Sequence, residues 1–207
     1  MIVFIINGKP AVGKDTFVSM VDKIFYQIRP SSIVSNISTV DRIKKAAGLL
    51  GWNGEKTPEA RKFLADLKAL STEYNDFPTM YCCDYAERNK DMFDILFIHC
   101  REPENITNIK NRILNISRIP CYTLQVVRED VEEVTSNTAD MNTDNYDYDI
   151  VVDNNGTIND LYNLAEYFVR FFIKNGPIDS KLTTGPFSYR RIFYMKGGKP
   201  DDTYVVV

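Results

Sequence analysis

The stretch of sequence that decides the fold reads Gly8-Lys9-Pro10-Ala11-Val12-Gly13-Lys14-Asp15-Thr16. An unbroken apolar run, Ile2-Val3-Phe4-Ile5-Ile6, precedes it and is typical of a strand buried on both faces. After it, apolar residues recur at steps of three and four, which indicates an amphipathic helix over 17–28. The sequence therefore predicts a strand, a glycine-containing turn and a helix in direct succession.

The spacing in this stretch, a glycine, four residues and then Gly13-Lys14, is that of a P-loop, a turn that binds nucleotide phosphates. The glycines permit tight curvature, so that backbone amides converge on phosphate oxygens at the positive end of the following helix. We expect Lys14 to reach the β and γ phosphates of ATP. The residues predicted to bind the nucleotide are Gly8, Lys9, Ala11, Val12, Gly13, Lys14, Asp15 and Thr16. A turn that binds no ligand is the plain alternative.

Asp15 departs from the general pattern, which has Ser or Thr at this position. A carboxylate approaches Mg²⁺ directly or through water, so Asp15 is the predicted metal ligand, and Thr16 keeps a hydroxyl one residue further on. ATP and Mg²⁺ are therefore the expected ligands.

The composition is that of an ordinary globular protein of 207 residues, which is enough for about one domain with an appendage. The net charge of −3 argues against binding a nucleic acid polymer, which requires a basic surplus. No run approaches the roughly 18 apolar residues of a membrane span, and the apolar N-terminus lacks the marks of a signal peptide. The four cysteines do not have a familiar zinc spacing, which favours a reducing, cytoplasmic location.

The remaining chain alternates strands with helices, which predicts a parallel sheet covered on both faces. Strands are predicted near 33–34 and over 93–99, 121–127 and 148–153. Helices are predicted over about 40–47, from Thr57-Pro58 onward, and over 79–90, 106–116 and 161–172. For the helix that begins at Thr57-Pro58, the predicted buried face is Phe63, Leu64, Leu67 and Leu70.

The chain divides into a main domain over 1–176 and a C-terminal, β-like extension over 177–207. Two short β-like runs surround Lys196-Gly197-Gly198-Lys199-Pro200 and predict an appended hairpin. Two roles are open for this extension: a strand added to the edge of the sheet, or the contact of a homodimer.

Several features in chain order resemble those of P-loop nucleotide kinases of the bacteriophage deoxynucleoside monophosphate kinase type, and of the related phosphomevalonate and dephospho-CoA kinases. They are the Gly-Lys-Asp-Thr ending of the loop, Asp41-Arg42-Ile43-Lys44, the 51–56 loop followed by Arg61, Ile98-His99-Cys100-Arg101 followed by Glu104, Val127-Arg128 and the 148–157 segment. The resemblance covers about residues 1–173. It implies a three-layer α/β/α P-loop NTPase fold with a mostly parallel sheet, an acceptor region over about 35–90 and a lid over about 128–147.

The resemblance also implies transfer of the γ-phosphoryl group of ATP to a small phosphorylated acceptor. By family order, the catalytic residues are Lys14, Asp41, Arg101 and Arg128, and the acceptor-binding residues are Asp41, Lys44, Arg61 and Arg101. Arg101 also follows the carboxyl end of a predicted strand, where open α/β sheets bind ligands. A surface salt bridge with Glu102 or Glu104 is the alternative for Arg101. His99 stands where the family often has Asp, which shifts the role of that carboxylate to Asp15 and Asp41. The simpler interpretation of His99 is a neutral histidine packed at the strand end.

The acceptor is open at this point. Aromatic residues of the acceptor region can stack on a base, which favours a nucleoside or deoxynucleoside monophosphate; they are Trp52, Tyr74, Phe77 and Tyr81. The same residues fit a core equally well. One alternative is a kinase of phosphomevalonate or dephospho-CoA. Another is an ATP-binding module without transfer, which His99 and the cation-poor stretch over 129–147 favour.

Overall fold

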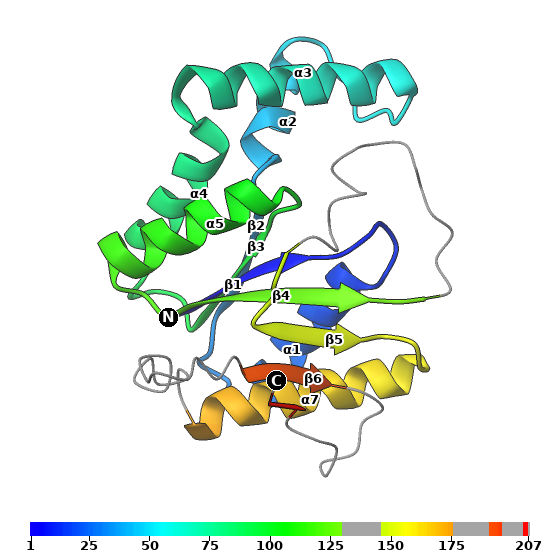
Figure 1. Ribbon diagram of the computed structural model, residues 1–207, viewed down its shortest axis with the longest axis vertical. Helices are drawn as coiled ribbons and strands as arrows, with labels where there is room; N and C mark the ends of the chain where they lie inside the picture. The colour runs from blue at the N-terminus through cyan, green and yellow to red at the C-terminus, as the bar shows by residue number, and fades with distance from the viewer. Residues whose placement is uncertain (130–145, 176–190, 196–204, 207) are drawn as a thin grey trace.

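A computed structural model describes residues 1–129, 146–175, 191–195 and 205–206 of the chain (Figure 1). The elements in chain order are β1 (Ile2–Asn7), α1 (Lys14–Ile28), β2 (Val34–Ser38), α2 (Asp41–Leu49), α3 (Pro58–Asn75), α4 (Phe77–Arg88), β3 (Ile95–His99), α5 (Pro103–Arg112), the π-helical turn η1 (Ile113–Ser117), β4 (Cys121–Val127), β5 (Ile150–Asp153), α7 (Ile158–Asn175), β6 (Arg191–Met195) and β7 (Val205–Val206).

The sheet has the order β2-β3-β1-β4-β5, and these five strands are all parallel. β6 continues the sheet parallel to β5, and β7 pairs antiparallel with β6. The predicted parallel sheet is therefore confirmed. The 191–195 part of the C-terminal extension is a strand added to the edge of that sheet, while most of 177–207 lies outside the described residues.

The core has two parts, because alternate residues of each buried strand face opposite sides of the sheet. On one side Phe4 and Phe97 of the sheet pack against α1 and α7, and the ring centres of Phe4 and of Phe168 in α7 lie 4.9 Å apart. On the other side Ile5 and Ile98 pack against α4 and α5. Figure 1 shows these helix pairs on opposite faces of the sheet. The fold is thus α/β, with helices covering both faces.

Local capping explains where two of the helices begin. The Thr57 hydroxyl accepts a hydrogen bond from the Ala60 amide at 3.2 Å, and Pro58 opens α3, as the sequence predicts. Before α7, the Thr157 amide donates to Asp160 Oδ2 at 2.7 Å, and the Asp160 amide donates to Thr157 Oγ1 at 3.3 Å. This reciprocal pair is a capping box.

The predicted buried face of α3 is covered only in part, because Leu64 and Leu67 are partly buried whereas Phe63 and Leu70 are exposed. Phe63 is 37% exposed and Leu70 is 64% exposed, and Ala60 is the residue of α3 that is fully buried. Figure 1 shows why: α3 lies beyond the sheet, at the top of the view, with α2 and α4 beneath it. Its apolar stripe therefore faces no sheet that could cover it.

The order of the strands creates a switch point between β1 and β3, which are neighbours in the sheet. The chain leaves β1 for α1 on one face, and leaves β3 for α5 on the other. In open α/β sheets a crevice forms outside the carboxyl ends of two such strands, and ligands bind there. The 8–13 turn and the residues from His99 to Glu102 follow these two strand ends.

Candidate functional site

The 8–13 turn connects β1 to α1 and requires both of its glycines. Gly8 has φ +144° and Gly13 has φ +96°, values that favour glycine. A Cβ atom at Gly8 would lie 2.3 Å from the Val126 carbonyl oxygen, and one at Gly13 would lie 2.6 Å from Asn154 Nδ2. The turn is therefore pressed against the ends of β4 and β5, and the tight curvature expected from the sequence is present.

Two buried asparagines hold the turn in place, and the sequence reasoning missed both roles. Asn7 Oδ1 accepts from the Gly8 amide at 2.7 Å, and Asn7 Nδ2 donates to the Arg101 carbonyl at 3.1 Å and to Tyr148 Oη at 2.6 Å. At the other end of the turn, Asn154 Nδ2 donates to the Val12 carbonyl at 2.8 Å. The available signal was an amide side chain directly after an apolar strand run, at positions 7 and 154.

Lys14 places its ammonium group over the turn. Its Nζ donates to the carbonyl oxygens of Gly8 and Lys9, each at 2.7 Å. Lys14 is also the first residue of α1, and the N-cap residue Gly13 has no side chain to cap the first amides of the helix. A cation and a helix N-terminus thus meet at one turn. This combination binds anions, because both supply positive charge and hydrogen-bond donors.

Asp15 and Thr16 are exposed on the first turn of α1. Asp15 Oδ1 lies 3.8 Å from Nδ1 of His99, a residue at the end of β3 whose side chain is 17% exposed. Burial lowers the pKa of His99, although the Asp15 charge acts in the opposite direction, so His99 is neutral at pH 7. His99 Nε2 is buried without a hydrogen-bond partner among the described residues. A neutral histidine packed at the strand end agrees with the simpler interpretation of the sequence.

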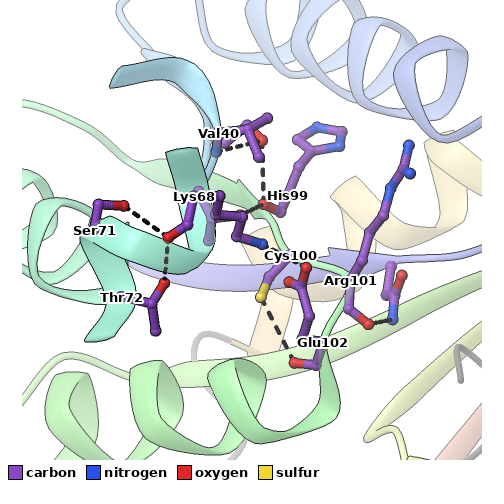
Figure 2. A network of polar contacts seen from close by, with 11 residues as sticks. Val40, Lys68, Ser71, Thr72, His99, Cys100, Arg101 and Glu102 are labelled. Atoms are coloured by element: carbon purple, nitrogen blue, oxygen red, sulfur yellow. Dashed lines mark hydrogen bonds and ion pairs between the residues drawn. The ribbon is translucent and has the colours of Figure 1, made fainter. Parts of the chain in front are cut away.

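Arg101 follows β3 on the same side as His99. Figure 2 shows the two side chains extending in the same direction, while Cys100 turns its thiol toward Glu102. The Arg101 carbonyl is held by Asn7, so its backbone is tied to the start of the 8–13 turn. The structure therefore brings Lys14, Asp15 and Arg101 to the carboxyl ends of β1 and β3.

The other predicted site residues are spread over the acceptor region and the end of β4. Asp41 Oδ2 accepts from the Ser38 amide at 2.7 Å, which closes the turn between β2 and α2. Lys44 is exposed on α2, and Arg61 Nε donates to the Lys56 carbonyl at 3.2 Å in the first turn of α3. Arg128 is exposed directly after β4, two residues beyond the Val126 carbonyl that touches the 8–13 turn. Most of the predicted lid, residues 130–145, lies outside the described residues.

The four aromatic side chains of the acceptor region differ in their surroundings. Tyr74 is 87% exposed, and Trp52 Nε1 donates to the Glu55 carbonyl at 3.1 Å. The rings of Phe77 and Tyr81 lie 6.4 Å apart, and the Arg42 guanidinium sits 5.0 Å from the Tyr81 ring centre. Tyr81 is therefore covered by a cation, whereas Tyr74 faces solvent.

Within residues 1–129, 146–175, 191–195 and 205–206, no three His, Cys, Asp or Glu side chains form a group that could hold a metal ion. None of the helices in these ranges has the length and apolar character needed to cross a bilayer. Comparison of the chain with models of protein families and with curated proteins finds no match.

Proposed function

We propose that this protein is a P-loop phosphotransferase that moves the γ-phosphoryl group of ATP to a nucleoside or deoxynucleoside monophosphate. The observation that carries the proposal is the position of Lys14, whose ammonium binds two carbonyl oxygens of the 8–13 turn at the N-terminus of α1. That turn lies at the switch point of the sheet, where α/β folds bind nucleotides.

The turn suits a polyphosphate better than a singly charged anion. The N-terminus of a helix carries about half a positive charge, and Lys14 adds a full one. Asn7 and Asn154 hold the two ends of the turn, so its amides do not need to be ordered when a phosphate arrives. Preorganised donors stabilise charge more strongly than mobile ones, because they lose less entropy on binding.

The exposed carboxylate of Asp15 and the hydroxyl of Thr16 fit a magnesium ion that arrives with the triphosphate. Mg²⁺ in nucleotide sites takes one or two carboxylates and completes its shell with water and phosphate oxygens. Bound with ATP, it supplies neutralisation of the charge between two anionic substrates. The Asp15 side chain is accessible for this role, since it is 92% exposed and its contact with His99 is a distant one of 3.8 Å.

Arg101 is the proposed ligand of the acceptor phosphate. It follows the strand next to β1, and Asn7 ties its backbone to the 8–13 turn that would hold ATP. A guanidinium binds phosphate through two parallel hydrogen bonds, which fixes the orientation of the group as well as its place. Arg128 is proposed to act at the transferring phosphate, and Lys44 and Arg61 at the acceptor. Asp41 is proposed to act with them, and it fixes the start of α2, the helix of Lys44, by accepting a hydrogen bond from the Ser38 amide.

The test is release of ADP from Mg-ATP with a panel of ribo- and deoxynucleoside monophosphates, phosphomevalonate and dephospho-CoA. We expect turnover with a nucleoside monophosphate and a loss of about 10²–10³-fold in Lys14→Ala, as for removal of one electrostatic contact to transferring charge. Lys23→Ala is the matched control, because Lys23 lies exposed on the same helix. Turnover with phosphomevalonate or dephospho-CoA alone would show that the acceptor is not a nucleoside monophosphate. ATP binding without any turnover would overturn the transferase and favour a binding module.

A further inference from the structure

One ion pair joins the acceptor region to the turn that carries Arg101. Lys68, in the middle of α3, places Nζ 2.5 Å from Oε1 of Glu102, which stands 34 positions later at the start of α5. The Lys68 side chain is 14% exposed and that of Glu102 34%. On the same helix, Lys62 and Asp66 form a pair that is 75% and 58% exposed. The Lys68–Glu102 pair is therefore better shielded from water than the Lys62–Asp66 pair.

The surroundings of this pair show that Lys68 and Glu102 are each anchored on their own element. The Lys68 carbonyl accepts from Ser71 Oγ at 2.8 Å and from Thr72 Oγ1 at 2.9 Å. The Glu102 carbonyl accepts from the Ile106 amide at 3.0 Å and from Cys100 Sγ at 3.9 Å. Figure 2 shows this network, with the Arg101 side chain directed away from it. The pair thus links two segments, at Lys68 and at Glu102, whose backbones are each held by local hydrogen bonds.

The pair matters for α3 because the helix has little apolar attachment. Ala60 is its one fully buried residue, and Leu70 and Tyr74 face solvent. Burial raises the pKa of Glu102, but the charge and hydrogen bond of Lys68, together with a backbone hydrogen bond and the Arg101 charge, lower it below its usual value, so the carboxylate is ionised at neutral pH. In this partly buried pair, removal of one partner leaves the other charge partly shielded from water and without its counter-charge, which is unfavourable. Removal of the Lys68 charge alone would therefore weaken the contact between α3 and the 99–102 segment.

We infer that Lys68 and Glu102 are a positioning pair that holds the acceptor helix α3 against the Arg101 turn and thereby sets the affinity for the phosphorylated acceptor. The inference rests on the proposed function, since it assumes that Arg101 and α3 bind that acceptor together. An acceptor that had to order a detached α3 would lose binding free energy to that ordering. The proposed ATP site is the 8–13 turn between β1 and α1, which contains neither α3 nor the Arg101 turn. We therefore expect the affinity for ATP not to depend on the pair.

The first experiment compares Lys68→Ala with Lys62→Ala in steady-state kinetics. We expect Lys68→Ala to raise KM for the acceptor roughly 10- to 100-fold, the size seen when a distant change misplaces a substrate. KM for ATP and kcat stay close to wild type, which marks a loss of ground-state binding of one substrate. Lys62→Ala changes none of the three, and Lys68→Arg recovers part of the acceptor affinity. An equal rise in both KM values would overturn the inference.

A second variant separates positioning from stability. Lys68→Met combined with Glu102→Gln removes both charges, so no unpaired ion remains buried and the protein stays folded. We expect this double variant to unfold at a urea concentration near that of wild type and still to show the raised KM for the acceptor. A wild-type KM in the double variant would show that the pair contributes stability alone, and would overturn the inference.

Hydrogen exchange of the full chain without substrates keeps this inference separable from the proposed function. Lys68→Ala is expected to speed amide exchange in α3 and over 100–106 together, while Lys62→Ala leaves both unchanged. Unchanged exchange in Lys68→Ala would overturn the positioning pair whatever the turnover. Absence of turnover in wild type, with the exchange response present, would overturn the proposed function and the role in acceptor affinity that rests on it.

Discussion

Gly8 and Gly48 illustrate how much a single glycine depends on its surroundings. A Cβ at Gly8 would meet the Val126 carbonyl at 2.3 Å on a backbone with φ +144°, whereas a Cβ at Gly48, in α2, would meet nothing within 4 Å. We expect Gly8→Ala to lower the free energy of unfolding by about 1–3 kcal/mol through backbone strain. Gly48→Ala is expected to raise it by roughly 0.5–1 kcal/mol, because glycine is unfavourable inside a helix. Urea unfolding measures both.

The same pair of variants tests the proposed nucleotide site. Gly8→Ala should also weaken ATP binding, measured by calorimetry, since the 8–13 turn must shift away from β4 to accommodate the methyl group. Gly48→Ala serves as the control and should bind ATP like wild type. Equal stability and equal ATP affinity in the two variants would contradict the close packing of the 8–13 turn against the end of β4.

Helices α3 and α7 have similar apolar spacing, but their apolar faces differ in burial. In α7 the apolar face is buried: Phe168 is completely covered, and Leu161, Leu164 and Ala165 lie at 4% exposure or less. In α3 Leu70 is 64% exposed. Amphipathic periodicity states which residues share a face, but it does not say whether a sheet lies under that face. α7 packs on the sheet beside α1, and α3 lies beyond it (Figure 1).

This contrast predicts two very different alanine substitutions. Phe168→Ala should lower the free energy of unfolding by about 3–5 kcal/mol, as for a large side chain removed from a core. Leu70→Ala should change it by less than about 0.5 kcal/mol, as for an exposed position. Thermal or urea unfolding of the two variants checks the expectation. A loss above 2 kcal/mol in Leu70→Ala would mean that the apolar side of α3 is covered in solution.

At the scale of the whole molecule, the reactivity of the four cysteines tests whether α4 and α5 stay packed on the sheet. All four are reduced and buried, and each belongs to the core between the sheet and the helices α4 and α5. Burial raises the pKa of Cys83 to about 11 and that of Cys100 to about 12, and it raises the pKa of Cys82 and Cys121 as well. The thiolate is the reactive form, so these groups are inert near neutral pH.

We therefore expect iodoacetamide at pH 8 to leave the folded protein unmodified over the time in which it alkylates free cysteine completely. In denaturant the same reagent should add four carbamidomethyl groups, counted by mass spectrometry, in agreement with the four cysteines of the sequence. Fast modification of one cysteine in the folded protein would show that α4 opens from the sheet on its own.

Sequence alone determined the features that depend on near neighbours. The apolar runs predict the strands, and β4 begins and ends at the predicted residues, Cys121–Val127. Spacing within nine residues predicts the turn over 8–13, and Thr57-Pro58 predicts where α3 begins. In each case the physical cause acts over one turn of chain: side-chain alternation, backbone sterics or a local hydrogen bond.

Only the tertiary structure decided which of these elements meet. Arg101 comes to the same edge of the sheet as Lys14 because β3 pairs with β1, although 87 positions separate the two residues. The roles of Asn7, Asn154, Lys68 and Glu102 depend on contacts between distant segments, and the exposure of α3 depends on its place beyond the sheet. Such contacts follow from strand order and from the face that each crossing helix takes. Those choices minimise the exposed apolar surface of the whole chain, so no short stretch of sequence carries them.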